Sequence, residues 1–311
     1  GIQTDHECVA ADEARDRISQ GMYVLIREGS AAKNLNDLLP AVTSHNARRF
    51  LFCTDDKHLD ELVDEGSIDH AIRLAIAAGM EPLQAIQLAT INAAECYGLS
   101  EKGALASGFE ADFILLDDLE TFKVAAVWKK GIQIAEQGGM LNATPSQEKC
   151  SVRISQSVHL PAITKNDLAI PFSKGSKATI IEIIPNQLVT NKVIENVDVV
   201  NGVFKANLEL DQLKVAVIER HHHKHTIGLG IVKGFGLKQG AVATTIAHDS
   251  HNAIVLGTND VDMLVAIEAL QDIQGGLVVV NDGLVLASLP LPVAGLMTQV
   301  PLEVAVKSLF E

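Results

Sequence analysis

The residues best suited to chemistry in this chain follow a short apolar run, Phe50-Leu51-Phe52-Cys53, which ends abruptly at Thr54, Asp55 and Asp56. A run of four apolar residues is too short for a helix and is typical of a strand buried on both faces. Carboxylates at the end of such a strand are costly to bury unless a metal ion, a partner or water receives them. Two interpretations are open: a catalytic or metal-binding carboxylate, or a cap for the helix that follows.

Two earlier segments share this design. Asp5-His6-Glu7 opens the chain, and Arg27-Glu28-Gly29-Ser30 follows the apolar run of residues 22–26. Helical patterns over residues 9–18 and 31–39 separate the three segments. Alternating strands and helices predict a parallel sheet with right-handed crossovers, so the three polar strand ends should lie on one rim. The shared rim favours the functional interpretation of Asp55 over the capping one.

The sequence changes character twice after this region. Helical patterns cover residues 59–78 and 82–97, and short strands then follow at 113–116, 124–128 and 131–135, which predicts a small antiparallel sheet. Residues 138–150 are polar and are interpreted as a linker. Beyond them, strands at 178–184, 215–219, 253–256, 277–280 and 284–287 accompany a helix at 260–271, capped by Asn259-Asp260, with Met263, Ile267 and Leu270 on one face. This segment is predicted to be an α+β domain.

Composition excludes several classes of function. The 311 residues suit roughly two domains, and the formal charge of −14 argues against nucleic-acid or anionic-membrane partners. No apolar run is long enough to span a bilayer. The four cysteines form no Cys-x-x-Cys pair, so reduced thiols in a cytoplasmic protein are expected.

Histidines supply the remaining candidates. His6 and Asp55 offer an imidazole and a carboxylate that suit a divalent metal, although two ligands do not complete a site. In the charged run of residues 219–225, we interpret His222, His223 and His225 as a solvated loop. The segment His248-Asp249-Ser250-His251 is either part of a site or a turn stabilised by its own side chains. The glycine pairs at residues 228–236 lack the spacing of a nucleotide-binding fingerprint.

These motifs resemble a known family. Residues 1–140 are similar to the end of an amidohydrolase-superfamily barrel, with Thr54-Asp55 resembling the aspartate of the last strand. More narrowly, nearly the whole chain resembles bacterial adenine deaminases, through the segments Thr4-Asp5-His6-Glu7, 26–34, 54–58, 228–237, 247–252, 257–260 and 290–297. The resemblance implies three parts: residues 1–102 as the last strands of a metal-dependent TIM barrel, 103–145 as part of a β-sandwich, and 151–311 as the C-terminal α+β domain of these enzymes.

The resemblance also implies an activity, the hydrolysis of adenine to hypoxanthine and ammonia in purine salvage. It implies a binuclear metal site holding manganese or iron, with zinc as a further option, and a homo-oligomer. His6 and Asp55 would be metal ligands, and Asp55 and Glu7 would be catalytic. Substrate contacts are assigned to Arg27, Glu28, Ser30, Asp56, His248, Asp249 and His251.

One departure limits this expectation. The family's first-strand His-x-His, its acidic bridging residue and its fifth-strand histidine should all precede His6, but this sequence starts at Gly1. Three strands do not close an eight-stranded barrel. We therefore expect this chain to be a fragment that is inactive by itself. The alternatives are a cyclic-amide hydrolase of the same superfamily, which should lack residues 220–300, and a non-catalytic purine-binding or assembly module. A nucleoside deaminase is disfavoured because those proteins lack the β-sandwich and the far domain.

Overall fold

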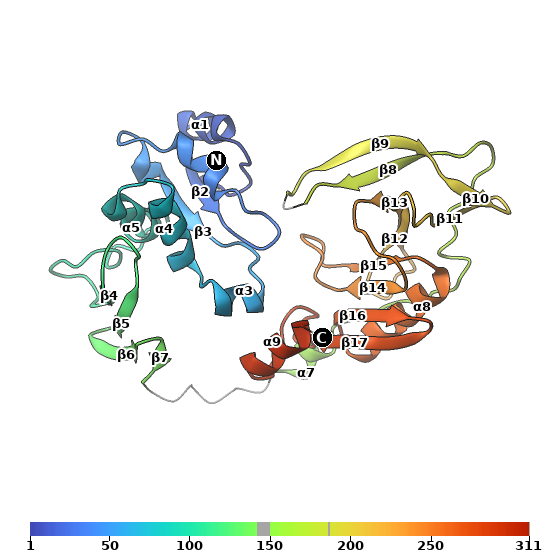
Figure 1. Ribbon diagram of the computed structural model, residues 1–311. Coiled ribbons are helices and arrows are strands. Elements are labelled where there is room, and N and C mark those ends of the chain that lie inside the picture. Colours follow the sequence, from blue (N-terminus) through green and yellow to red (C-terminus); the bar gives the residue numbers. More distant parts are fainter. Residues whose placement is uncertain (142–149, 186, 311) are drawn as a thin grey trace. The chain divides into compact units, whose positions relative to one another are not determined.

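The computed structural model describes residues 1–141, 150–185 and 187–310 (Figure 1). The chain divides into two compact units, Gly1–Ser146 and Gln147–Glu311. Each unit is a mixture of helices and strands with its own core. Among the described residues, no helix is long and apolar enough to cross a membrane.

The first unit is built on three parallel strands in the order β1-β2-β3. These strands are β1 (Thr4–Asp5), β2 (Tyr23–Arg27) and β3 (Phe50–Cys53). Helix α1 (Ala11–Ser19) connects the first pair, and α2 (Leu35–Leu38) with two short 3-10 turns, Leu39–Ala41 and Ala47–Arg49, connects the second. The predicted parallel sheet with its strand ends on one rim is confirmed. Over the described residues, these strands form an open sheet and not a closed barrel.

Three predicted helices are shorter or more divided than their apolar patterns indicate. The pattern over residues 59–78 is split into α3 (Leu59–Asp64) and α4 (Ile68–Ala77), because Gly66 between them adopts a φ of +96°. The pattern over 82–97 is split at Thr90 into α5 (Pro82–Ala89) and α6 (Ile91–Cys96). The helix predicted from residue 31 begins only at Leu35, because Lys33 first pairs back with Glu28 in an isolated bridge.

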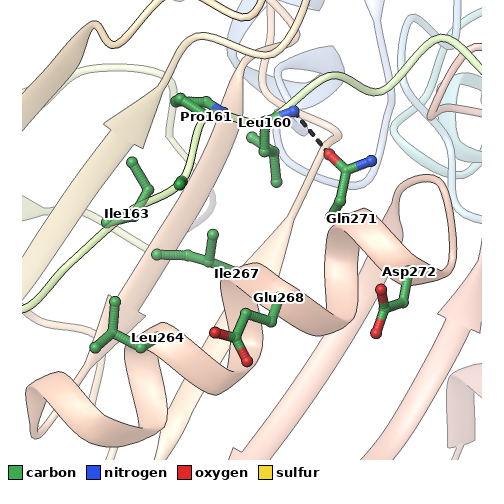
Figure 2. Close-up of a pocket in the computed structure, with 9 residues that line it drawn as sticks. Leu160, Pro161, Ile163, Leu264, Ile267, Glu268, Gln271 and Asp272 are labelled. Carbon is green, nitrogen blue, oxygen red and sulfur yellow. Dashed lines mark hydrogen bonds between the residues drawn. The ribbon is translucent and has the colours of Figure 1, made fainter.

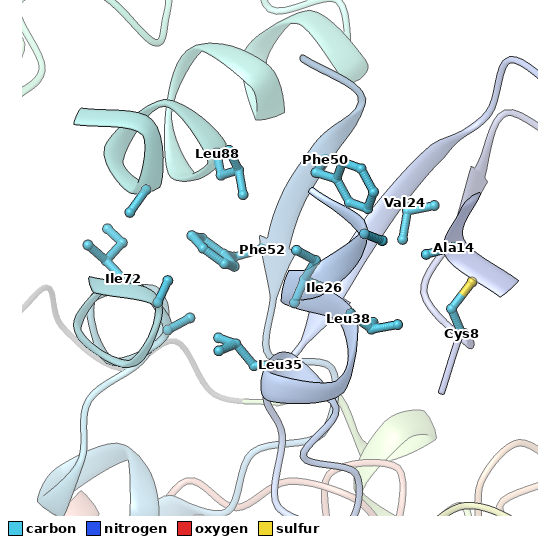
Figure 3. Close-up of a cluster of buried hydrophobic side chains, with 14 of the residues drawn as sticks. Cys8, Ala14, Val24, Ile26, Leu35, Leu38, Phe50, Phe52, Ile72 and Leu88 are labelled. Carbon is cyan, nitrogen blue, oxygen red and sulfur yellow. The ribbon is translucent and has the colours of Figure 1, made fainter. Parts of the chain in front are cut away.

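The core of this unit lies between the sheet and its helices (Figure 3). Val24, Ile26, Phe50 and Phe52 project from β2 and β3 and are at most 5% exposed. They pack with side chains from the helices, which include Ala14, Leu35, Leu38, Ile72 and Leu88. Because apolar side chains cover the strands, the polar residues immediately after them are fixed at the edge of the core.

A small antiparallel sheet completes the first unit, as predicted. Its strands are β4 (Phe113–Leu116), β5 (Val124–Lys129), β6 (Ile132–Glu136) and β7 (Gly139–Met140), paired in that order. The rings of Phe113 and Trp128 stack with centroids 4.9 Å apart. The expected linker of residues 138–150 is corrected at its start, where Gly139 and Met140 pair with β6. Residues 142–149 of that expected linker lie outside the described residues.

The second unit is mostly β. Its eight-stranded sheet has the order β17-β16-β14-β15-β12-β13-β8-β9. The strands are β8 (Lys177–Ile183), β9 (Thr190–Asn196), β12 (Leu213–Ile218), β13 (Ile227–Lys233), β14 (Ala241–Thr244), β15 (Ala253–Gly257), β16 (Gly276–Asn281) and β17 (Leu284–Pro290). A separate pair, β10 (Asp198–Val200) and β11 (Val203–Lys205), and the helices α7 (Val152–Ser155) and α9 (Leu302–Phe310) complete it.

Helix α8 (Asp260–Asp272) packs on β14, β15 and β16. The Asn259 side chain accepts a hydrogen bond from the Asp262 backbone N–H, at 2.9 Å, and so caps the helix as predicted. Met263, Ile267 and Leu270 are at most 4% exposed. Their shared buried face confirms the pattern in the sequence.

Candidate metal and catalytic site

The rim of the three-stranded sheet brings together His6, Glu7 and Asp55. One ligand atom from each of the three side chains lies within 4.8 Å of the others. The distance from His6 Nε2 is 3.0 Å to Glu7 Oε1 and 4.0 Å to Asp55 Oδ2. No other group of three such residues was found in the described parts of the chain. The two residues predicted as metal ligands and the second predicted catalytic residue therefore converge.

Neither Asp55 nor Asp56 stands at the N-cap position of the helix that follows β3. Helix α3 begins at Leu59, and the residue at its N-cap position is His58, without a side-chain capping bond. Asp55 instead adopts a left-handed φ of 54°, which is uncommon for a residue other than glycine. The capping interpretation is therefore wrong, and the Asp55 carboxylate lies at the rim beside His6.

The loop after β2 supports this turn. The Ser30 backbone N–H donates to the Asp56 carbonyl oxygen at 2.9 Å. The Ser30 hydroxyl accepts from the His58 N–H at 2.8 Å and also donates to the Glu61 carboxylate. These bonds tie the loop after β2 to Asp56 and His58, which follow Asp55, and the Glu28 N–H donates to the Cys53 carbonyl oxygen at 3.0 Å before it.

The predicted substrate contacts of this rim have protein partners. Arg27 Nη1 lies 3.0 Å from Asp55 Oδ2 and 3.2 Å from Glu7 Oε2. Glu28 is 8% exposed and accepts from the Leu35 N–H at 3.3 Å. Burial raises the pKa of Glu28, against the opposing effect of that hydrogen bond. Arg27 and Glu28 thus face the protein interior at this rim.

The donor set fits a divalent metal ion. An imidazole nitrogen and carboxylate oxygens are ligands for manganese, iron and zinc. Glu7 contacts Arg27 through Oε2 and His6 through Oε1. Asp55 contacts Arg27 through Oδ2, and its other oxygen does not take part in that contact. Three donors leave further coordination positions to water or to other residues. The arrangement therefore offers one ion donor atoms from His6, Glu7 and Asp55.

The predicted site residues of the second unit lie in the loop between β14 and β15. The rings of His248 and His251 are 5.1 Å apart, and His248 and Asp249 are exposed. Burial lowers the pKa of His251, with smaller contributions in the same direction from His248 and Arg220. These residues gather in one loop of their own unit.

Arg220 is a residue of this region that the sequence did not reveal. Its side chain is 2% exposed, Nε donates to the His251 carbonyl oxygen and Nη2 donates to Ala294 O at 3.0 Å. It stands in a charged run typical of a solvated loop, and no signal in the sequence sets it apart. The loop interpretation is confirmed for His222, His223 and His225, which are all exposed. His222 pairs with Glu219 at 3.0 Å, and His225 pairs with Asp167 at 2.9 Å.

The second unit also contains a cavity of about 370 Å³ between residues 160–163 and α8 (Figure 2). Ile163, Leu264 and Ile267 form its apolar part, and Glu268 and Asp272 lie on its helical side. Gln271 ties its two walls together, accepting from the Leu160 N–H at 2.7 Å and donating to Val158 O at 3.0 Å. None of the predicted site residues lines this cavity.

Known protein families match most of the residues of each unit. The amidohydrolase family matches residues 5–134, and the adenine deaminase C-terminal domain matches residues 187–311. The chain is 62% identical over 309 residues to an adenine deaminase of Lysinibacillus sphaericus (strain C3-41), covering 99% of this chain and 53% of the relative. It is 56% identical over 299 residues to an adenine deaminase of Geobacillus kaustophilus (strain HTA426), covering 96% and 52%.

Among solved structures, the β-aspartyl dipeptidase of Fervidobacterium islandicum AW-1 gives a TM-score of 0.36 at 18% identity, covering 45% of this chain and 41% of that one. This level of similarity carries no argument about function.

The rim of histidine and carboxylates at the ends of parallel strands, together with the match over residues 5–134, defines the class of the first unit: these residues match the amidohydrolase family. With its second unit included, nearly the whole chain is similar to adenine deaminases, and residues 187–311 match the adenine deaminase C-terminal domain. The chain spans about half the length of the curated relatives it matches.

Proposed function

We propose that this chain provides part of the active site of an enzyme that hydrolyses adenine to hypoxanthine and ammonia. The observation that carries the proposal is the convergence of His6, Glu7 and Asp55 in a chain that is 62% identical to an adenine deaminase. The match of residues 187–311 to the adenine deaminase C-terminal domain favours this activity over that of a cyclic-amide hydrolase.

The reaction replaces the C6–N bond of adenine by a C6–O bond. A bound divalent metal lowers the pKa of water, so that hydroxide is available near neutral pH. Asp55 is the group that accepts the proton from the attacking water and returns it to the leaving amine, and its position beside His6 suits that role. Glu7, 3.0 Å from His6, is placed to hydrogen-bond a ring nitrogen of the purine.

The rest of the catalytic apparatus is part of the same proposal. Manganese, iron or zinc would be held by His6 and Asp55 with further ligands from outside this rim. We propose residues 1–102 as the barrel portion, 103–145 as the sandwich portion and 151–311 as the C-terminal domain, with homo-oligomers as the working assembly. The four free cysteines support a reducing compartment such as the cytoplasm.

The test combines an intact mass with ammonia release from adenine in the presence of Mn²⁺. We expect the protein at its natural length to release ammonia, and the Asp55→Asn variant to lose this activity. A chain of 311 residues is expected to be inactive alone, because three donors do not make a binuclear site. Ammonia release by the 311-residue chain would contradict that expectation. Purine binding without ammonia release by the protein at its natural length would favour a binding module instead.

A further inference from the structure

The contact between Arg27 and the rim has an unusual distribution of burial. The Arg27 side chain has 0% exposure, whereas the side chains of its two partners, Glu7 and Asp55, are 58% and 37% exposed. The guanidinium lies beneath the carboxylates, on the side of the core. A residue that contacts a small substrate needs surface that the substrate can reach, and Arg27 has none among the described residues.

We infer that Arg27 is a positioning residue, which holds the Glu7 and Asp55 carboxylates next to one another and does not contact the substrate. The roles of those two carboxylates rest on the proposed function; the geometry of the three side chains does not.

The physical argument begins with charge. Two carboxylates at one small site repel each other, and an arginine between them offsets that repulsion with two charge-assisted hydrogen bonds. Both bonds use one nitrogen, Nη1. Each carboxylate is thereby held through a single oxygen, and its second oxygen is left for other partners.

A further hydrogen bond, to a buried side chain, fixes the orientation of the guanidinium. Arg27 Nη2 donates to Asn34 Oδ1 at 3.3 Å, and Asn34 is fully buried. Arg27 also stands at the last position of β2, where its backbone pairs in register with Cys53 of β3. The Arg27 backbone is therefore fixed in the sheet, and Nη2 is fixed by its bond to Asn34. Nη1 is then directed at the two carboxylates.

Lysine does not reproduce this arrangement. Its ammonium is a compact charge on a flexible stem, whereas the planar guanidinium contacts Asn34 and the carboxylates through different nitrogens at once. Lysine at residue 27 keeps the charge but loses the fixed geometry, so Arg27→Lys separates positioning from simple charge neutralisation. Arg27→Met removes both, and Arg15→Met removes an exposed arginine that pairs with Asp12 as the matched control.

The experiment measures two properties of these variants in the protein at its natural length. The first is the visible absorption spectrum with Co²⁺ bound, which reports the ligand geometry without any need for activity. The second is the pair kcat and KM for adenine. A urea unfolding curve shows which variants are folded, and Arg27→Lys decides the question if Arg27→Met does not fold.

For Arg27→Met we expect an altered Co²⁺ spectrum and a kcat reduced about tenfold or more, with KM within about twofold of the parent. Arg27→Lys should give an intermediate kcat, and Arg15→Met should match the parent in every property. A raised KM with unchanged kcat would show a substrate contact and overturn the inference. If the parent protein does not deaminate adenine, the proposed function fails, but the Co²⁺ spectrum still tests the role of Arg27. If both Arg27 variants then give the same spectrum as the parent, the inference that Arg27 is a positioning residue is overturned.

Discussion

Gly29 and Thr54 approach each other so closely that a Cβ at residue 29 would lie 2.5 Å from the Thr54 carbonyl oxygen. The same Cβ would lie 2.9 Å from the Asp56 carbonyl oxygen. The φ of Gly29 is not positive, so its requirement for glycine is one of space and not of backbone conformation. The loop after β2 and the turn that carries Asp55 are therefore packed backbone against backbone.

This packing predicts that Gly29→Ala displaces the Asp55 turn. We expect the free energy of unfolding to fall by about 1–3 kcal/mol, the usual cost of overpacking, and metal affinity to weaken because Asp55 leaves its place beside His6. Urea unfolding and Mn²⁺ titration calorimetry measure the two effects. Gly139→Ala is the control, because its nearest contact would be a backbone oxygen at 3.6 Å. Equal stability of Gly29→Ala and the parent would show that the turn adapts freely.

His6 gives a prediction specific to the metal. Its imidazole is the nitrogen donor of the rim, so His6→Ala should lower Mn²⁺ affinity at least about tenfold. Its side chain is 46% exposed, so stability without metal should change little. Calorimetric titration of the two proteins measures the difference, and exposed His45 provides a His45→Ala control. An unchanged affinity would remove His6 from the ligand set.

The strands of the rim could be predicted because two independent features of the sequence coincide there. The apolar runs at residues 22–26 and 50–53 are too short for helices, and both end in charged residues. Parallel topology then places the ends together. The contacts made by Arg27 could not be predicted, because a charged residue after a strand has the same sequence signal whether it faces substrate or the interior.

The second unit shows a different limit. Strand β9 reads Thr-Asn-Lys-Val-Ile-Glu-Asn over residues 190–196 and lies at the edge of the sheet with most of its residues exposed. Strand β13 contains Gly228 and Gly230, which weaken a strand signal. Both strands escaped prediction, because pairing with the preceding strand, β8 for β9 and β12 for β13, holds them in the sheet, and not their own composition.

Asn92 links α6 to the start of β3 and gives a prediction about stability. It is 1% exposed, and its Nδ2 donates to the carbonyl oxygens of Ala47 and Phe50, each at 2.8 Å. Asn92→Ala leaves one buried and one partly buried carbonyl acceptor without this donor, which should lower the free energy of unfolding by about 2–4 kcal/mol. The fluorescence of Trp128, the one tryptophan of the chain, reports unfolding of the same unit. Exposed Asn36 supplies the control variant Asn36→Ala, and a loss as small as in that control would refute the prediction.

Glu219 gives a prediction about pH. Its side chain is 15% exposed. Burial would raise its pKa, but hydrogen bonds from the His222 ring and from the N–H groups of His221, His222 and Lys224 outweigh burial and lower the pKa to about 2. A carboxyl group with a lowered pKa stabilises the fold fully at pH values above its ordinary pKa of 4.5. This contribution is lost as the pH falls toward about 2.

The difference in free energy of unfolding between the parent and Glu219→Gln should therefore be largest above pH 4.5 and should shrink as the pH falls toward 2. Urea unfolding at a series of pH values measures this difference, with Glu209→Gln at an exposed position as the control. A difference that stays constant across this range would mean that the Glu219 carboxylate does not hold the loop through its charge. The result also bears on the neighbouring histidines, because the Glu219 carboxylate binds the backbone of the run from His221 to Lys224.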